Sequence, residues 1–226
     1  MVSSERICEE VNRKQTLMDA NQFRWRRVGG GWLVGLALLA VLVFWYLRGR
    51  NSPPIAAAGG TAFTNFAAIS TPHYLQRDPQ WKDDTIGSGE TLAKVGCTVS
   101  SLAMALESYG VSFTPGMLNA ALKTNGGYTR RGWLVWSAVE KISDGKASVR
   151  ALDKPTHADL DAALQARQPV LAKVFINKII PHWVLVSGKD GTNYLMRDPL
   201  DETKSLRPLA SYGSEVYGVR IVESRK

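Results

Sequence analysis

"VGCTVSSLAMAL", residues 95–106, places a cysteine between a glycine and a run of apolar residues at helical spacing. This spacing predicts a helix that begins near Cys97 and stops at the glycine in position 110. A thiol at a helix N-terminus loses its proton more easily, because the unpaired N–H groups and the helix dipole stabilise the thiolate. Free cysteine is also among the most frequently buried residue types, so a purely structural role is the alternative.

His182 and Asp198 are the residues best placed to work with such a thiol. His182 begins a predicted strand, "HWVLVSG" (182–188), and Asp198 ends the next one, "NYLMRD" (193–198). A turn, "GKDGTN" (188–193), would place the two strands and these two side chains next to each other. The carboxylate would then fix the orientation of the imidazole, and the imidazole would activate the thiol.

The rest of the second half is rich in strands, whereas the first half is helical. This order predicts an α+β fold with a mostly antiparallel sheet. The sequence contains no glycine-rich phosphate loop and no metal-ligand cluster, so no cofactor and no metal are expected. The further predicted helices are 114–126, 132–142 and 156–168, and the further predicted strands are 147–152, 169–176 and 216–222.

An uncharged stretch from residue 28 to residue 47 predicts a transmembrane helix. Twenty helical residues span about 30 Å, the thickness of a bilayer's hydrocarbon core. Positive charge is heavier before this stretch than after it, which predicts a cytoplasmic N-terminus. The expected segments are a cytoplasmic basic tail (1–27), the span (28–47), a flexible linker (48–69) and one globular domain (70–226). The domain would face the outer, periplasmic side of the inner membrane.

The expected topology bears on the two cysteines of the chain. Cys8 would face the reducing cytoplasm and Cys97 an oxidising compartment, so the two would not pair. An unpaired cysteine is unusual in an exported domain. The formal net charge of +8 is scattered along the chain, which argues against a nucleic-acid partner.

Six sequence segments resemble, in their order, the bacteriocin-leader-processing, double-glycine cysteine peptidases. The resemblance runs from about Tyr74 to Leu200 and implies a papain-like fold. The segments are "YLQRDPQW" (74–81), "VGCTVSSLAMAL" (95–106), "NGGYTRRGWLVW" (125–136), "PVLAKV" (169–174), "HWVLVSG" (182–188) and "YLMRDPL" (194–200).

The resemblance also implies roles for individual residues. Cys97 would be the nucleophile, His182 the general base and then acid, and Asp198 the residue that orients the imidazole. Gln76, in "YLQRDP", matches the glutamine that forms the oxyanion hole together with the cysteine's backbone N–H. Gln80 is the alternative for this last role, because Gln76 lies farther from the cysteine than in other papain-like enzymes.

We therefore expect a membrane-anchored cysteine peptidase that acts on a peptide or protein through a thioester intermediate. One alternative keeps the Cys-His-Asp triad but hydrolyses peptidoglycan stem peptides. A second alternative is a non-catalytic scaffold, a secretion or virion component that retains the fold. A complex with other envelope proteins is compatible with each of the three.

Overall fold

The computed structural model describes residues 35–42 and 53–225, and the chain divides into two units at Asn51. In the N-terminal unit, residues 35–42 form a helix with exposed side chains. Most of the predicted span, residues 28–47, lies outside the described residues, as does the basic tail. Among the residues that the structure describes, no helix is both long and apolar enough to cross a membrane.

The C-terminal unit is built around a six-stranded sheet, and every strand pair in it is antiparallel. The strand order is β1-β4-β3-β6-β2, and β5 pairs with β4. Helices precede most of the strands, so the predicted α+β class with an antiparallel sheet is confirmed. The strands are β1 (Ala58–Phe63), β2 (Ala147–Leu152), β3 (Val170–Ile176), β4 (Ile180–Arg197), β5 (Arg207–Pro208) and β6 (Gly218–Ser224).

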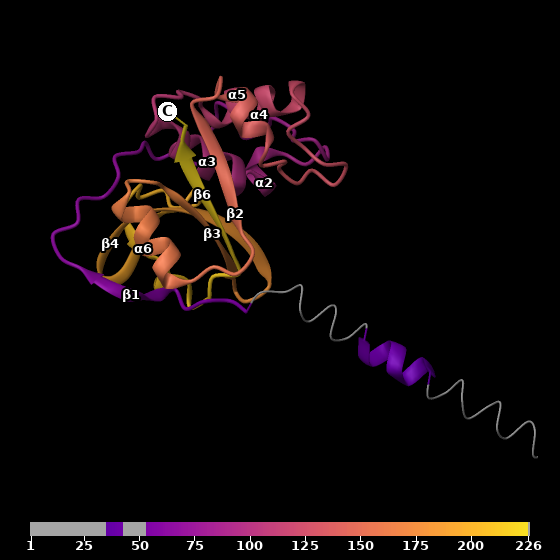
Figure 1. The fold of residues 1–226 in the computed structure, drawn as a ribbon. Helices are drawn as coiled ribbons and strands as arrows, with labels where there is room; N and C mark the ends of the chain where they lie inside the picture. The colour runs from indigo at the N-terminus through magenta and orange to yellow at the C-terminus, as the bar shows by residue number, and fades with distance from the viewer. Residues whose placement is uncertain (1–34, 43–52, 226) are drawn as a thin grey trace, which may run out of the picture. The chain divides into compact units, whose positions relative to one another are not determined.

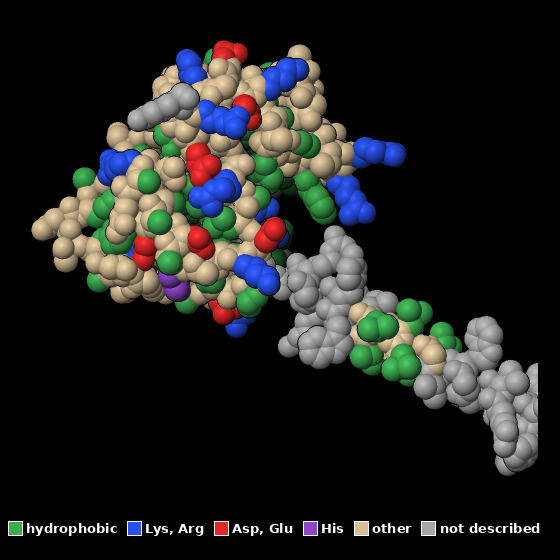
Figure 2. Space-filling view, viewed as in Figure 1, with side chains coloured by type: hydrophobic (Ala, Val, Ile, Leu, Met, Phe, Trp, Pro, Cys, Tyr) green, Lys and Arg blue, Asp and Glu red, His purple; other side chains and the backbone are tan. Residues whose placement is uncertain are grey.

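Helices cover the sheet in two groups. In Figure 1, α2, α3, α4 and α5 gather above the sheet, while α6 lies beside β1 and β4. On the face of the molecule drawn in Figure 2, basic and acidic side chains are interspersed. The helices are α2 (Leu92–Val95), α3 (Cys97–Glu107), α4 (Pro115–Thr124), α5 (Ala138–Ile142) and α6 (His157–Gln165), and a 3-10 helix, η1, covers Leu209–Tyr212.

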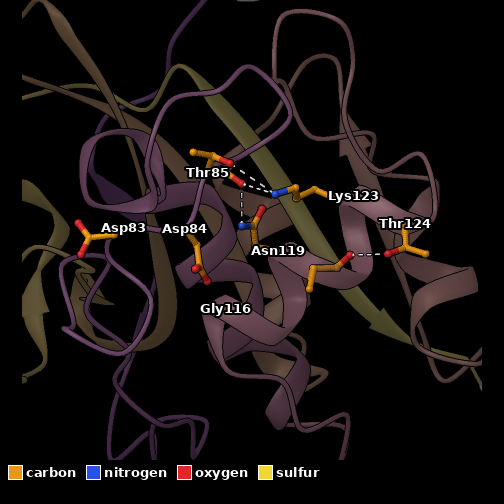
Figure 3. A pocket seen from close by; sticks show the side chains of 8 residues that line it. Asp83, Asp84, Thr85, Gly116, Asn119, Lys123 and Thr124 are labelled. Atoms are coloured by element: carbon orange, nitrogen blue, oxygen red, sulfur yellow. Dashed lines mark hydrogen bonds between the residues drawn. The ribbon is translucent and has the colours of Figure 1, made fainter.

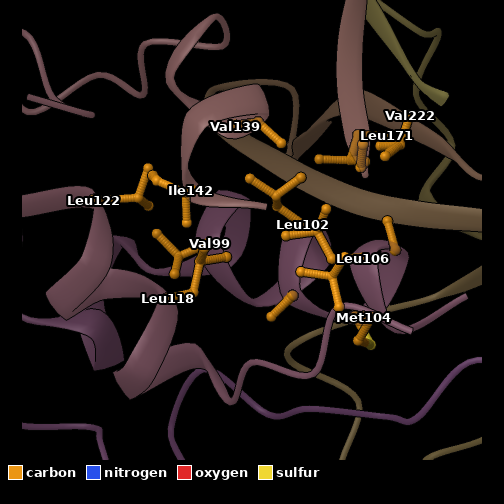
Figure 4. Packing of buried hydrophobic residues seen from close by; sticks show 14 of the residues in the cluster. Val99, Leu102, Met104, Leu106, Leu118, Leu122, Val139, Ile142, Leu171 and Val222 are labelled. Carbon is orange, nitrogen blue, oxygen red and sulfur yellow. The ribbon is translucent and has the colours of Figure 1, made fainter. Parts of the chain in front are cut away.

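Two apolar cores hold these layers together. The first joins α3 to α4, α5 and one face of the sheet, and Figure 4 shows how its side chains interdigitate. Leu102, at the centre of α3, is fully buried there, and burying one leucine stabilises a fold by about 1.5–3 kcal/mol. The second core joins the other face of the sheet to α6, β1 and η1. Helix α3 is therefore fixed against the sheet along its length.

A close approach at Gly96 sets the position of Cys97. The N–H of Gly96 donates to the carbonyl of Leu92, which ends α2, and α3 begins at the next residue. A Cβ atom at Gly96 would lie 2.4 Å from the carbonyl oxygen of Leu92. Only glycine fits such a junction, so the Gly-Cys pair places the thiol in the first turn of α3.

The linker prediction is wrong for the residues that the structure describes. Residues 53–69 belong to the C-terminal unit, which begins at Ser52, and they contribute the edge strand β1. The backbone N–H of Thr61 donates to Asp161 on α6 at 2.7 Å, and Asp161 pairs with the buried Lys189 of β4. Strand pairing and this contact hold a segment whose composition is typical of a tether.

The third predicted helix, 132–142, is also wrong in its first half. Only Ala138–Ile142 is helical, and the preceding residues form a turn closed by a bridge between Tyr128 and Leu134. Gly132 has a φ of 78° there, a left-handed conformation that glycine adopts without strain. Turn formation therefore replaces the first turns of the expected helix.

The two strands predicted at 182–188 and 193–198 form one element, β4, in the structure. A fully extended chain from residue 182 to residue 198 would span about 50 Å. His182 and Asp198 nevertheless lie within hydrogen-bonding distance of each other, so the chain reverses within β4. Gly191, with a φ of 54°, lies inside this reversal. The chain therefore changes direction as predicted, but the residues before and after the reversal belong to one strand, β4.

Candidate active site

Cys97 is the first residue of α3, and its thiol is free and buried. Its side chain lies near the hydroxyl of Thr98, with 3.9 Å between Sγ and Oγ1, and it is hydrogen-bonded by the backbone of Trp183 on β4. The backbone N–H groups of the first helical turn have no acceptor within the helix. They stabilise a negative charge on the sulfur or on an oxygen bound next to it.

His182 and Asp198 form a buried pair next to this thiol. The Nε2 atom of His182 lies 2.8 Å from Oδ1 of Asp198. Both side chains are only 3% exposed, so the pair is shielded from water. Because Nε2 is engaged by the carboxylate, Nδ1 is the ring nitrogen left for the thiol. The structure thus brings these two predicted site residues together in the arrangement that orients an imidazole.

Asp198 is held by more than the histidine. Its carboxylate also accepts hydrogen bonds from the backbone N–H of Leu200, at 2.9 Å, and from the hydroxyl of Tyr212. Burial by itself would raise the pKa of Asp198, but the hydrogen bond and charge of His182 and these other donors lower it below its usual value. The carboxylate is therefore ionised at neutral pH and fixed in one orientation.

The pKa values of the thiol and the imidazole are coupled. Burial alone would lower the pKa of His182, but hydrogen bonds with Asp198 and Cys97 raise it to about 9. Burial alone would raise the pKa of Cys97, but the hydrogen bond and charge of His182 bring it below its ordinary value. Each side chain stabilises the charged form of the other, so the pair favours thiolate and imidazolium.

Gln76 is buried next to α2, whereas Gln80 is exposed. The backbone N–H of Gln76 donates to the carbonyl of Pro199, and its Nε2 donates to the carbonyl of Ala93 on α2 at 2.9 Å. This amide therefore lies between the helix that precedes Cys97 and the loop that follows Asp198. Of the two glutamines, Gln76 is therefore the one that contacts both of these segments.

Tyr212 and His73 also contact Asp198, although no sequence pattern gives either residue a role. Tyr212 ends η1, and the centre of its ring lies 5.8 Å from that of His182. Nothing in the local pattern marks it, because only the tertiary fold brings η1 to the end of β4. His73 lies in the segment before Gln76, with Nε2 2.8 Å from the backbone carbonyl of Asp198. Burial lowers the pKa of His73, so its neutral ring supports this loop.

A separate hollow lies between residues 83–85 and α4 (Figure 3). Its volume is about 550 Å³, and Asp83, Asp84 and Lys123 are among the residues that line it. The Nζ atom of Lys123 donates to the carbonyl of Thr85 at 3.0 Å. None of the residues that line this hollow belongs to the Cys97 site. Within the described ranges, no group of three or more histidine, cysteine or acidic residues is arranged to hold a metal ion.

Comparison with solved structures finds a likeness to a C39-like peptidase from Bacillus anthracis. The two sequences are 16% identical, the TM-score is 0.41, and the match covers 74% of this chain and 100% of that chain. No protein-family model and no curated protein matches the chain.

Proposed function

We propose that this protein is a cysteine peptidase that hydrolyses peptide bonds with Cys97, His182 and Asp198. The observation that carries the proposal is the pair of His182 and Asp198, with 2.8 Å between Nε2 and Oδ1, set against a thiol at the start of α3. Opposite shifts in the pKa values of Cys97 and His182 support the same assignment, since they favour a reactive thiolate.

The chemistry follows from this arrangement. The Cys97 thiolate attacks the carbonyl carbon of the scissile bond and forms a tetrahedral intermediate. The His182 imidazolium gives its Nδ1 proton to the leaving amine as the C–N bond breaks, which leaves a thioester. The neutral imidazole then takes a proton from water, and the resulting hydroxide attacks the thioester. The C–S bond then breaks, the carboxylic acid product leaves, and the Cys97 thiolate is restored beside the imidazolium, which keeps the proton that it took from water. Asp198 holds the ring in position and stabilises its charge in both steps.

Gln76 and the backbone N–H of Cys97 are the proposed oxyanion hole. One proton of the Gln76 amide is used by the carbonyl of Ala93, and the second remains for the substrate oxygen. The N–H of Cys97 opens α3 and has no acceptor inside that helix. A donor aimed at the developing oxyanion is worth about 3–4 kcal/mol of barrier.

Membrane anchoring is part of the proposal. The uncharged stretch 28–47 and the basic residues before it support a single transmembrane helix with the N-terminus in the cytoplasm. The catalytic domain would then lie on the periplasmic side and act on a peptide or protein in that space. The reaction needs no cofactor in this scheme, because the thiol, the imidazole and the carboxylate carry out every step.

Turnover of a quenched peptide library by site variants tests the proposal. Cys97→Ala should abolish cleavage, because no nucleophile remains. Asp198→Asn should lower kcat by about 100-fold or more, because the imidazole loses its orientation and part of its charge stabilisation. Asp190→Asn, at an exposed position of β4, is the matched control and should leave kcat unchanged. Cleavage that persists unchanged in Cys97→Ala would show that this thiol is not the nucleophile.

A further inference from the structure

Arg220 of β6 lies between two tryptophans. Its guanidinium carbon is 5.4 Å from the ring centre of Trp136 and 5.6 Å from that of Trp183. One of its terminal nitrogens donates to the backbone carbonyl of Val219. Its Nε is buried without a hydrogen-bond partner among the described residues. The two rings flank the guanidinium and restrict its orientation, and one of its nitrogens has a hydrogen-bond acceptor among the described residues.

The register of the sheet places this arginine on the face that carries α3. Arg220 is opposite Leu171, and Lys173 is opposite Trp183, so the side chains of all four leave the same face of the sheet. Leu171 packs in the core formed with α3. Arg220 therefore lies on the side of the sheet against which the helix of Cys97 is packed.

Trp183 connects the arginine to the reacting groups. It directly follows His182 in β4, and its backbone hydrogen-bonds Cys97. Its carbonyl accepts a hydrogen bond from Ser101 of α3 at 3.1 Å, which ties this part of the strand to the cysteine helix. The contact with Cys97 is made by the backbone of Trp183, whereas its ring leaves the α3 face of the sheet and lies against Arg220.

Neither Arg220 nor Lys173 has a carboxylate partner among the described residues. Arg220 and Lys173 form no ion pair within the part of the chain that the structure describes. Burial lowers the pKa of Arg220, and the charge of the exposed Asp153 opposes this shift. Lys173 places its Nζ 5.4 Å from the ring centre of Phe175. The two tryptophan rings offset part of the cost of burying the guanidinium, and a bound carboxylate would offset more of it.

We infer that Arg220, assisted by Lys173, binds a carboxylate of the substrate close to the scissile bond. The preferred substrate would then be an acidic peptide, with an Asp or Glu side chain at one fixed position. The guanidinium fork accepts a carboxylate with two parallel hydrogen bonds, and the two tryptophans hold the fork ready for it. This inference rests on the proposed peptidase activity and assigns its substrate class.

Paired peptides test the inference. In a synthetic pool, each peptide occurs with Glu and with Gln at the varied position, and mass spectrometry follows cleavage of both members by the full-length protein in detergent. We expect the Glu member to be cleaved about ten- to a hundredfold faster at one position, in line with a charge-assisted contact. Arg220→Gln should remove this preference while cleavage of the Gln member changes less than about twofold. Arg220→Lys should keep part of it.

Arg150→Gln is the matched control. Arg150 lies on the neighbouring strand β2, is opposite Ile221, and is already paired with Glu223 at 2.7 Å. Its replacement should leave the preference for Glu intact. Thermal unfolding of each variant distinguishes loss of substrate recognition from loss of folding. The preference for Glu over Gln peptides is measured on the unaltered protein, so this result does not depend on any variant.

The outcomes distinguish this inference from the proposal beneath it. Cleavage that depends on Cys97 but shows no preference for acidic members at any position would overturn the inference alone. Preference that survives in folded Arg220→Gln would also overturn it. Absence of any cleavage that depends on Cys97 would overturn the peptidase proposal and the substrate class with it.

Discussion

The pKa values of Cys97 and His182 shift in opposite directions because each side chain stabilises the charge of the other. The pKa of His182 in the folded protein, about 9, lies above its ordinary value of 6.5. Its protonated ring therefore stabilises the fold fully below the ordinary value, and this stabilisation is lost as the pH rises through about 9. Asp198 has a lowered pKa, so its contribution is present above its unfolded value and is lost as the pH falls through the folded one.

Individual site residues were predictable to different degrees. The sequence predicted that His182 and Asp198 lie side by side, and the structure places them so, because a reversal in β4 brings its two ends together. Tyr212 and Arg220 could not be predicted. Each reaches its partners through strand register and the packing of η1, which no local pattern records.

Gln76 and Gln80 provide a prediction with an internal control. Gln76→Ala should lower kcat by roughly 100- to 1000-fold, because one donor to the oxyanion is removed. Gln80→Ala should leave kcat unchanged, since that side chain is exposed. Alkylation of Cys97 should proceed at the same rate in both variants, because neither glutamine sets the pKa of the thiol. Equal activity of Gln76→Ala and Gln80→Ala would remove Gln76 from the oxyanion hole.

At the level of elements, β1 shows how tertiary contacts override composition. The segment that contains it has the Ala, Gly and Pro content of a tether, and its sequence has no alternating pattern. Its stability comes from pairing with β4 and from Asp161, which accepts from Thr61 and pairs with Lys189. The rings of Phe63 and Tyr194 surround the lysine ammonium. These partners lie a hundred residues or more farther along the chain, so short-range patterns miss them.

Loss of Asp161 should therefore destabilise the domain strongly. Asp161→Ala leaves the Lys189 ammonium buried without a counter-ion, and we expect the free energy of unfolding to fall by about 3–5 kcal/mol. Urea unfolding followed by fluorescence measures this change. Asp190→Ala, at an exposed site of the same sheet, should change stability by less than about 0.5 kcal/mol. A double variant, Asp161→Leu with Lys189→Met, should recover most of the lost free energy of unfolding. If Asp161→Ala were as stable as the unaltered protein, the ion pair would contribute little to stability.

At the scale of the whole molecule, the α+β class and the antiparallel sheet followed from the order of helical and strand-like segments. The boundary of the domain did not, because the N-terminal edge strand is recruited by long-range pairing. The predicted membrane span, 28–47, lies mostly outside the described residues, and the orientation of the chain stays a prediction.

Protease accessibility tests that orientation. If the basic N-terminal flank stays in the cytoplasm, protease added to intact spheroplasts should remove the domain after residue 51 and leave the N-terminal segment protected. Immunoblots against tags at the two ends would record the fragments, with lysed spheroplasts as the control for full digestion. A domain protected until lysis would reverse the orientation and place Cys97 in the reducing cytoplasm.

The reactivity of Cys97 toward iodoacetamide at about pH 6 reports whether the folded protein holds this thiol as a thiolate, and the measurement needs no known substrate. Peptide mapping of the reduced, detergent-solubilised protein compares Cys97 with Cys8, which lies among acidic residues in the sequence and should keep a pKa near the ordinary thiol value of about 8.5. We predict much faster labelling of Cys97, loss of most of this advantage in His182→Ala, and equal rates for both cysteines after unfolding. Slower labelling of Cys97 than of Cys8 in the folded protein, with access of the reagent confirmed at high pH, would contradict the account and leave Cys97 as a buried structural residue.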